Sequence, residues 1–136
     1  GDKKICDNIN QLCYFLLEKN FKAESCQLMK SFLDVKNSNF FDLNMNDTLS
    51  DLYVSDGNYQ DAYQNDLKIF SDIKTQKIDF EKLYGQSAPI HFYLIYGVMD
   101  ISTFYKSIAN RVKINEKYKQ FILSQKPAQD FLSILS

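Results

Sequence analysis

Residues 49–62 read LSDLYVSDGNYQDA, in which large, small and turn-forming residues fall at the spacing of two antiparallel helices. The large residues of the first helix share one face: Leu49, Leu52 and Tyr53. The triplet Asp56-Gly57-Asn58 follows, and glycine ends many helices because it adopts a left-handed backbone at little cost. The return helix carries a row of aromatic and small residues: Tyr59, Ala62, Tyr63 and Phe70. The stretch therefore predicts a helical hairpin.

Five positions of this hairpin match the spacing of a known helix-pair signature. A large residue, an aromatic one, a glycine, a second aromatic one and a small residue stand at Leu49, Tyr53, Gly57, Tyr59 and Ala62. This spacing resembles the tetratricopeptide repeat over residues 46–73. The resemblance implies antiparallel helix pairs that stack on one another. Because a stable array needs about three such units, the other helices either are degenerate repeats or close a compact helical bundle.

The N-terminal quarter of the chain predicts another hairpin. A helix from Lys3 to Lys19, with Asp2 as its N-cap, would bury one apolar face: Ile5, Ile9, Leu12, Cys13 and Leu16. A second helix would bury a similar row: Cys26, Met29, Phe32 and Leu33. The turn at 19–22 echoes residues 57–60, with Phe21 lying 38 residues before Tyr59. This echo indicates a similar architecture without establishing a repeat.

The rest of the chain also favours helices. The polar residues 37–47 form the expected linker, and the second hairpin would start at Asn46 or Asp47 and continue to Ile73. Residues 90–98 have a strand-like composition, but no second strand is available to pair with them, so we prefer a helix. Further helical segments are expected at 78–84, 101–112, 118–122 and 131–135. The predicted class is all-α, with about seven to nine helices.

Length and composition bound the class of protein. A chain of 136 residues has the size of one domain, here residues 1–136, and a hydrophobic content of 45% is too high for a disordered segment. The net charge of −1 excludes a chain-wide attraction to nucleic acid or acidic membranes. The longest apolar run, at 90–99, has about ten residues against the roughly 20 that a bilayer needs. We therefore expect no membrane span.

Residues that usually carry catalysis or bind metals are few. Thiols occur at three positions: Cys6, Cys13 and Cys26. Their odd number and their spacing do not fit a zinc site. We therefore expect the thiols to be buried and reduced, and the protein to be cytoplasmic. His91 is the only histidine, and the scattered glycines build no phosphate-binding loop. An enzyme would need His91 or a carboxylate pair such as Asp79 and Glu81 in a pocket, so we expect no enzyme, no cofactor and no metal.

Charge is unevenly distributed along the chain. Between Lys36 and Lys68 there is no basic residue, while aspartates recur every four or five positions. The second hairpin predicts a groove formed by three tyrosines with three aspartates at its rim: Tyr53, Tyr59, Tyr63, Asp51, Asp61 and Asp66. Such a groove suits a basic or amphipathic peptide. Helix capping and solvation are the alternative explanation of these aspartates.

The C-terminal third has the opposite balance of charge. Its basic residues are Lys106, Arg111, Lys113, Lys117, Lys119 and Lys126. Their density is below that of a nucleic-acid-binding arm, so we expect no binding of nucleic acid. The acidic second hairpin and the basic C-terminal third permit head-to-tail association of copies into a homo-oligomer. The leading hypothesis is a non-enzymatic adaptor that binds a protein or peptide segment through the aromatic and acidic groove. The alternative is a small effector or regulatory domain that blocks a partner protein.

Overall fold

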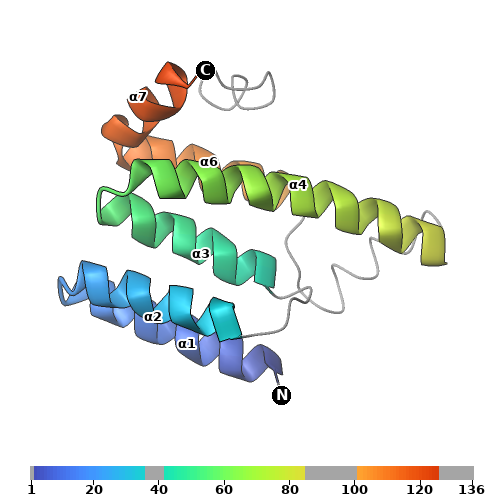
Figure 1. Ribbon diagram of the computed structural model, residues 1–136, viewed down its shortest axis with the longest axis horizontal. Helices are drawn as coiled ribbons and strands as arrows, with labels where there is room; N and C mark the ends of the chain where they lie inside the picture. The colour runs from blue at the N-terminus through green and yellow to red at the C-terminus, as the bar shows by residue number, and fades with distance from the viewer. Residues whose placement is uncertain (1, 36–41, 85–100, 126–136) are drawn as a thin grey trace.

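The computed structural model describes residues 2–35, 42–84 and 101–125, and every regular element in these ranges is an α-helix. The helices are α1 (Asp2–Glu18), α2 (Lys22–Val35), α3 (Asp42–Ser55), α4 (Tyr59–Tyr84), α6 (Ile101–Ile114) and α7 (Glu116–Ser124). Figure 1 shows them following one another in layers, from the α1–α2 pair at the bottom to α7 at the top. The predicted all-α class and the antiparallel hairpins are confirmed for these residues.

α3 begins earlier than the sequence suggested. It starts at Asp42, whereas we expected the start at Asn46 or Asp47, so part of the expected linker is helical. The additional turn carries Leu43 and Met45, which are both buried. Most helical stability in proteins comes from packing of an apolar face, and burial of these two side chains therefore extends the helix.

α4 is longer than predicted. It runs without a break from Tyr59 to Tyr84, although we expected an end at Ile73 and a separate helix at 78–84. No glycine or proline lies between its first and last residues, so nothing in the sequence ends the helix. α4 has 26 residues, yet neither it nor any other described helix combines the length and apolarity needed to cross a membrane.

The two C-terminal helices match the prediction closely. α6 covers the expected range 101–112, and α7 covers 118–122. Asn115 separates them, and its side-chain oxygen accepts a hydrogen bond from the backbone N–H of Tyr118 at 3.1 Å, which caps the start of α7. The helix expected at 90–98 and the turn expected at 131–135 lie outside the described residues.

The hairpins α1–α2 and α3–α4 close with the same turn. Asn20 (φ 67°) and Gly57 (φ 78°) both adopt the left-handed backbone and stand 37 residues apart. In both turns the next residue, Phe21 or Asn58, donates its N–H to the carbonyl oxygen five positions earlier, at 2.8 Å. This bond satisfies a carbonyl group that the helix end would leave unpaired. The two hairpins therefore repeat in geometry at a spacing of 37 residues, one fewer than the alignment of Phe21 with Tyr59 suggested.

Two clusters of buried side chains form the core. The first cluster lies between α1, α2 and α3 and consists of Cys6, Cys13, Cys26, Met29, Met45, Leu49 and Leu52. The second cluster joins α3, α4, α6 and α7 and includes Val54, Ala62, Ile69, Phe104, Ile108, Tyr118 and Ile122. Tyr53 packs against both clusters, so α3 connects the two parts of the core.

α1 packs through a face that only partly matches the predicted one, since Cys13 is buried as expected and Ile9 packs against the first cluster. Cys6 and Cys13 are buried with Leu17 beside them, while Ile5 and Leu12, which we expected in the core, are exposed. α1 is apolar on two sides, and the periodicity of the sequence does not say which side meets the neighbouring helices. The exposed side of α1 is thus a surface feature that the sequence placed in the interior.

The three cysteines behave as expected. All are buried in the first cluster, and no disulfide joins them. Burial raises the pKa of the Cys13 thiol, and burial, with added repulsion from Asp56 and Asp61, raises the pKa of Cys26 to about 11. These two thiols stay protonated at neutral pH and act as small apolar side chains.

Candidate functional site

The C-terminal helices cover the aromatic part of the predicted groove. Tyr59 stacks on Tyr118 with ring centroids 6.0 Å apart, and Tyr63 meets Phe121 edge-on at 6.2 Å. Tyr63 is buried. The expectation of an open aromatic surface is therefore wrong at Tyr63, which is buried, while Tyr59 is half-buried against α7 of the same chain. Large aromatic side chains gain more from such packing than from contact with water.

The other predicted groove residues point in different directions. Asp51 and Tyr53 are two positions apart on α3, which sets them about 200° apart around the helix. Tyr53 packs against the two core clusters, whereas Asp51 faces α1 and α6. Asp61 is exposed in the first turn of α4, where its negative charge interacts favourably with the helix dipole. Asp66 is fully buried, so its expected place at a rim is wrong, and the six residues form no single surface.

Three aspartates instead gather around Arg111 of α6. Its Nη2 donates to Oδ1 of Asp47 at 2.6 Å and to Oδ1 of Asp66 at 3.0 Å, and its Nη1 donates to Oδ1 of Asp51 at 2.9 Å. The hydroxyl of Tyr118 donates to the other oxygen of Asp66 at 2.6 Å. Arg111 Nε is buried and has no hydrogen-bond partner among the described residues. This group, which we call the Arg111 cluster, joins α3, α4, α6 and α7.

Burial and charge act against each other in the Arg111 cluster. Burial alone would lower the pKa of Arg111, but the carboxylates of Asp66, Asp47 and Asp51 outweigh it and hold this pKa above its ordinary value. Burial raises the pKa of Asp66 and of Asp47, and it exceeds the opposing effect of Arg111. The pKa of Arg111 rises because three carboxylates act on it, while the pKa of Asp66 and of Asp47 rises because these carboxylates share a single guanidinium charge. The guanidinium stays charged, and acidic groups are in excess around it.

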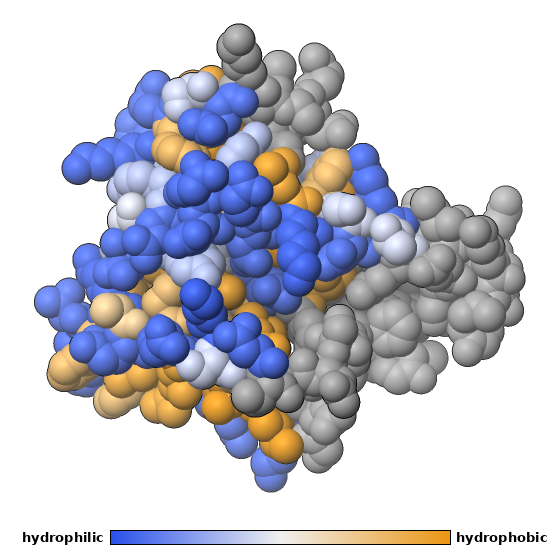
Figure 2. Space-filling model, in the orientation of Figure 1, coloured by the Kyte–Doolittle hydropathy of each residue, from blue (hydrophilic) through white to orange (hydrophobic). Residues whose placement is uncertain are grey.

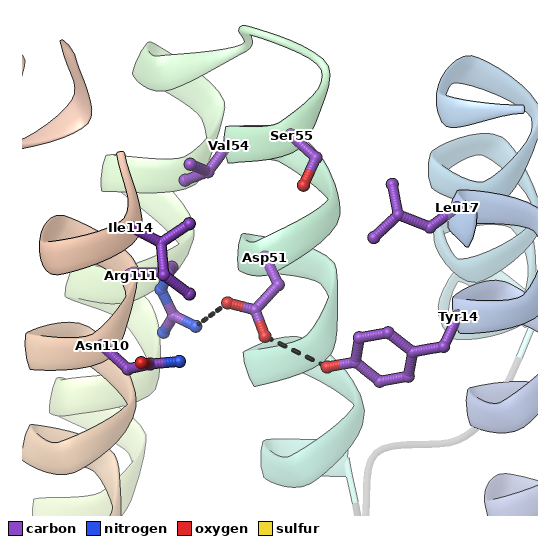
Figure 3. Close-up of a pocket in the computed structure, with 8 residues that line it drawn as sticks. All are labelled: Tyr14, Leu17, Asp51, Val54, Ser55, Asn110, Arg111 and Ile114. Carbon is purple, nitrogen blue, oxygen red and sulfur yellow. Dashed lines mark hydrogen bonds and ion pairs between the residues drawn. The ribbon is translucent and has the colours of Figure 1, made fainter. Parts of the chain in front are cut away.

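A cleft of about 290 Å³ lies beside the Arg111 cluster, between α1, α3 and α6. It is lined by Tyr14, Leu17, Asp51, Val54, Ser55, Asn110, Arg111 and Ile114. Figure 3 shows Tyr14 and Arg111 reaching the Asp51 carboxylate from opposite sides. Tyr14 donates its hydroxyl to Oδ2 of Asp51 at 3.1 Å, while Arg111 bonds to Oδ1. The Asp51 side chain is 34% exposed, more than those of Asp47 and Asp66, so it is the carboxylate that a ligand can reach.

The groups in the cleft suit recognition of a ligand more than acid–base chemistry. Burial and the charge of Asp51 raise the pKa of Tyr14 to about 12, so this phenol remains a hydrogen-bond donor at neutral pH. Among the described residues, no group of histidine, cysteine and carboxylate side chains could hold a metal ion. His91 and the side chains of Asp79 and Glu81, named as candidates for catalysis, lie outside the described residues.

Sequence reasoning missed the two residues that organise this site, Arg111 and Tyr118. Arg111 is the only arginine of the chain, and it falls in the apolar register of α6 with Phe104 and Ile108. An arginine is rarely buried unless it is paired, so its place on that face was a signal for a buried partner. Asp66 stands at a matching apolar position of α4 and is that partner.

Comparison of the chain with protein-family models, curated proteins and solved structures gives no match. The site is therefore interpreted from its own geometry, and two features decide what it can bind. These are the accessible carboxylate of Asp51 and the apolar side chains that surround it.

Proposed function

We propose that this chain is a non-enzymatic interaction domain that binds a segment of a partner protein in the cleft between α1, α3 and α6. The observation that carries the proposal is the partly exposed Asp51 carboxylate on the floor of the cleft. The cleft replaces the aromatic groove of the second hairpin as the proposed binding surface. The expected partner is still a basic or amphipathic peptide segment.

The charge of the cleft favours a cationic group on the partner. Arg111 carries one positive charge against the three carboxylates of Asp47, Asp51 and Asp66, so the local balance is negative. Each oxygen of Asp51 accepts one hydrogen bond from the chain, and a carboxylate has about four acceptor sites in all. Acceptor capacity remains for a lysine or arginine side chain of the partner, which forms a charge-assisted bond.

The size and apolar rim of the cleft favour a side chain over a cofactor. Pockets for small ligands are typically about 300–1,000 Å³, so a cleft of about 290 Å³ has room for one or two side chains of a peptide. Leu17 and Val54 supply apolar wall, and Ile114 is 76% exposed beside the cleft. A partner that places a cationic side chain on Asp51 can cover Ile114 with an adjacent apolar residue.

The proposal is tested with a library of short peptides in which lysine is present either unmodified or acetylated. Binding is followed by amide chemical shifts of Ser55 and Asn110, which line the cleft. We expect lysine peptides with an apolar neighbour to bind, and acetylated peptides to bind at least about tenfold more weakly because they lose a charged hydrogen bond.

Two variants test whether binding depends on the charge in the cleft or on the overall negative charge of the surface. Asp51→Asn removes the accessible charge in the cleft, and Asp61→Asn makes the same chemical change at an exposed position on α4. Binding should fall about tenfold in Asp51→Asn and stay unchanged in Asp61→Asn. Equal loss in both variants, or shifts confined to residues outside the cleft, would mean that the cleft is not the binding site.

A further inference from the structure

Two uncharged polar side chains line the cleft together with Asp51. Ser55 follows Asp51 by one turn on the same face of α3, and Asn110 extends from α6 toward α3 (Figure 3). Neither side chain makes a hydrogen bond within the part of the chain that the structure describes. Ser55 is half-buried and Asn110 is exposed, so a ligand in the cleft can reach both. With the free acceptor sites of Asp51, the cleft thus presents three acceptor groups from two helices.

Apolar side chains form much of the remaining wall of the cleft. They are Leu17 of α1, Val54 of α3 and Ile114 of α6. Figure 2 shows apolar side chains at the lower part of the molecule as well, where α1 and α2 lie, but in the cleft they stand beside hydrogen-bond acceptors. A lysine side chain combines an apolar stem with an ammonium group that has three N–H donors, and such stems pack along apolar surface. The cleft matches both parts of that side chain.

We propose that the cleft is selective for the unmodified ammonium group of a lysine side chain of the partner, and that its N–H groups bond to Asp51, Ser55 and Asn110. This inference rests on the proposed function, and it adds the chemical group that the cleft selects and two residues that select it. The three acceptors stand on different sides of the cleft, which suits the diverging donors of an ammonium group.

An arginine side chain of the partner fits these acceptors less well. Its planar guanidinium pairs best with a carboxylate when two parallel N–H groups reach both oxygens together. In the cleft, Oδ2 of Asp51 already accepts a hydrogen bond from Tyr14, and Oδ1 accepts one from Arg111. A second guanidinium would compete with these bonds at both oxygens, whereas an ammonium group needs one free acceptor site of Asp51.

Methylation of the partner's lysine should also weaken binding. A trimethylated lysine keeps the positive charge and the stem, but it has no N–H group to donate to the three acceptors. Sites that recognise quaternary ammonium groups surround the cation with aromatic rings. Tyr14 is the one aromatic residue among the described residues that line the cleft. The cleft should therefore bind lysine through hydrogen bonds as well as charge, and methylation of that lysine should act as a switch for the interaction.

Three capped amino acids test this selectivity: the N-acetyl, N-methylamide derivatives of lysine, arginine and trimethyllysine. Each is titrated into the whole chain over a millimolar range, and binding is followed by the amide chemical shifts of Leu17 and Ile114, on α1 and α6. We expect the lysine derivative to bind, and the other two to bind at least about fivefold more weakly.

Each other outcome of the titrations contradicts the selectivity. Equal affinities for lysine and trimethyllysine would mean that the cleft responds to charge alone, and equal affinities for lysine and arginine would mean that its acceptors do not select. Either result overturns this inference and leaves the cleft as a binding site. If none of the three compounds shifts the cleft residues, the inference is also overturned, and the peptide library then decides the proposed function separately.

Substitutions test the two selecting residues. Ser55→Ala and Asn110→Ala should each weaken binding of the lysine derivative about fivefold, with little effect on the trimethyllysine derivative. The matched controls are Ser71→Ala on α4 and Asn8→Ala on α1, both at exposed positions that do not line the cleft. Circular dichroism checks that every variant keeps the wild-type helix content. Unchanged affinity in both cleft variants, or the same loss in the controls, would show that Ser55 and Asn110 do not bind the ammonium group.

Discussion

A single arginine holds three helices in register in this protein. Arg111 bonds to Asp47 and Asp51, which are one turn apart on α3, and to Asp66 on α4. Buried ion pairs contribute little net stability, because the loss of hydration offsets the attraction between the charges. Their geometry is nevertheless demanding, and an arrangement of α3, α4 and α6 that separates these groups would leave charges buried without partners. The Arg111 cluster thus selects one packing of the helices.

Removal of the guanidinium should be strongly destabilising. Arg111→Met keeps most of the side-chain volume but leaves the fully buried Asp66 without its cation. We expect the free energy of unfolding in urea to fall by about 3–5 kcal/mol. Asn110→Ala, at the exposed neighbouring position, should change it by less than about 0.5 kcal/mol. A loss below about 1 kcal/mol in Arg111→Met would show that the cluster is not buried as described.

Asp66 should make stability depend on pH. Burial raises its pKa in the folded state above the ordinary value of 3.8, so the folded protein keeps a proton that the unfolded chain has already released. The contribution of Asp66 to the free energy of unfolding is therefore greatest below the ordinary pKa and is lost as the pH rises through the folded-state pKa. The stability of the wild type relative to Asp66→Asn should decrease in urea unfolding as the pH rises above the ordinary pKa of 3.8. A relative stability that increases with pH would mean that Arg111 lowers this pKa.

The sequence alone could predict the charged residues of the site but not their partners. Asp51 and Asp66 were named as binding residues because they belong to an acidic segment, yet the cation that pairs with them is 60 and 45 residues away in the chain. Periodicity assigns residues to faces of one helix, and it carries no information about which faces of distant helices meet. Arg111 and Tyr118 could be placed beside Asp66 only once the packing of α4 against α6 and α7 was known.

At the scale of elements, the two repeated turns depend on residues that tolerate a left-handed backbone. Gly57 adopts φ 78°, and a Cβ added there would meet no atom within 4 Å, so only backbone strain opposes a substitution. Gly57→Ala should lower the free energy of unfolding by about 1 kcal/mol, and Asn20→Ala should cost a similar amount at the equivalent turn. Thermal unfolding of the two variants measures this loss of stability, and Gln60→Ala, at an exposed position of α4, is the control. A neutral result at both turns would contradict their shared geometry.

α1 shows where reasoning from periodicity reaches its limit. The apolar row of Ile5, Ile9, Leu12, Cys13 and Leu16 predicted the buried face of this helix. The core receives Cys13 with Ile9 packed beside it, as predicted, but it adds Cys6 and Leu17 and leaves Ile5 and Leu12 exposed. The existence and type of α1 were predictable from sequence, while its rotation about its own axis depends on the shapes of the neighbouring helices.

At the scale of the whole molecule, stacking of hairpins explains both the fold and its surfaces. α3 buries one side in the first core cluster and another in the second, and each hairpin covers the next. The resemblance of residues 46–73 to a tetratricopeptide repeat stays a prediction. Each helix pair in such a stack needs a neighbour to bury its apolar face, and α1 leaves Ile5, Leu12 and Phe15 exposed.

The shared helix α3 should make the described helices unfold together. Met29→Ala opens a cavity in the first cluster and Ile108→Ala opens one in the second, and each should cost about 2–5 kcal/mol. If the clusters are coupled through α3, each variant should show one unfolding transition, at a lower midpoint than the wild type. Circular dichroism and the fluorescence of the nine tyrosines should then give the same midpoint for that variant. Gln27→Ala, exposed on α2, is the control for α2 itself. A separate early transition in Met29→Ala alone would show that the α1–α2 hairpin unfolds independently of the second cluster.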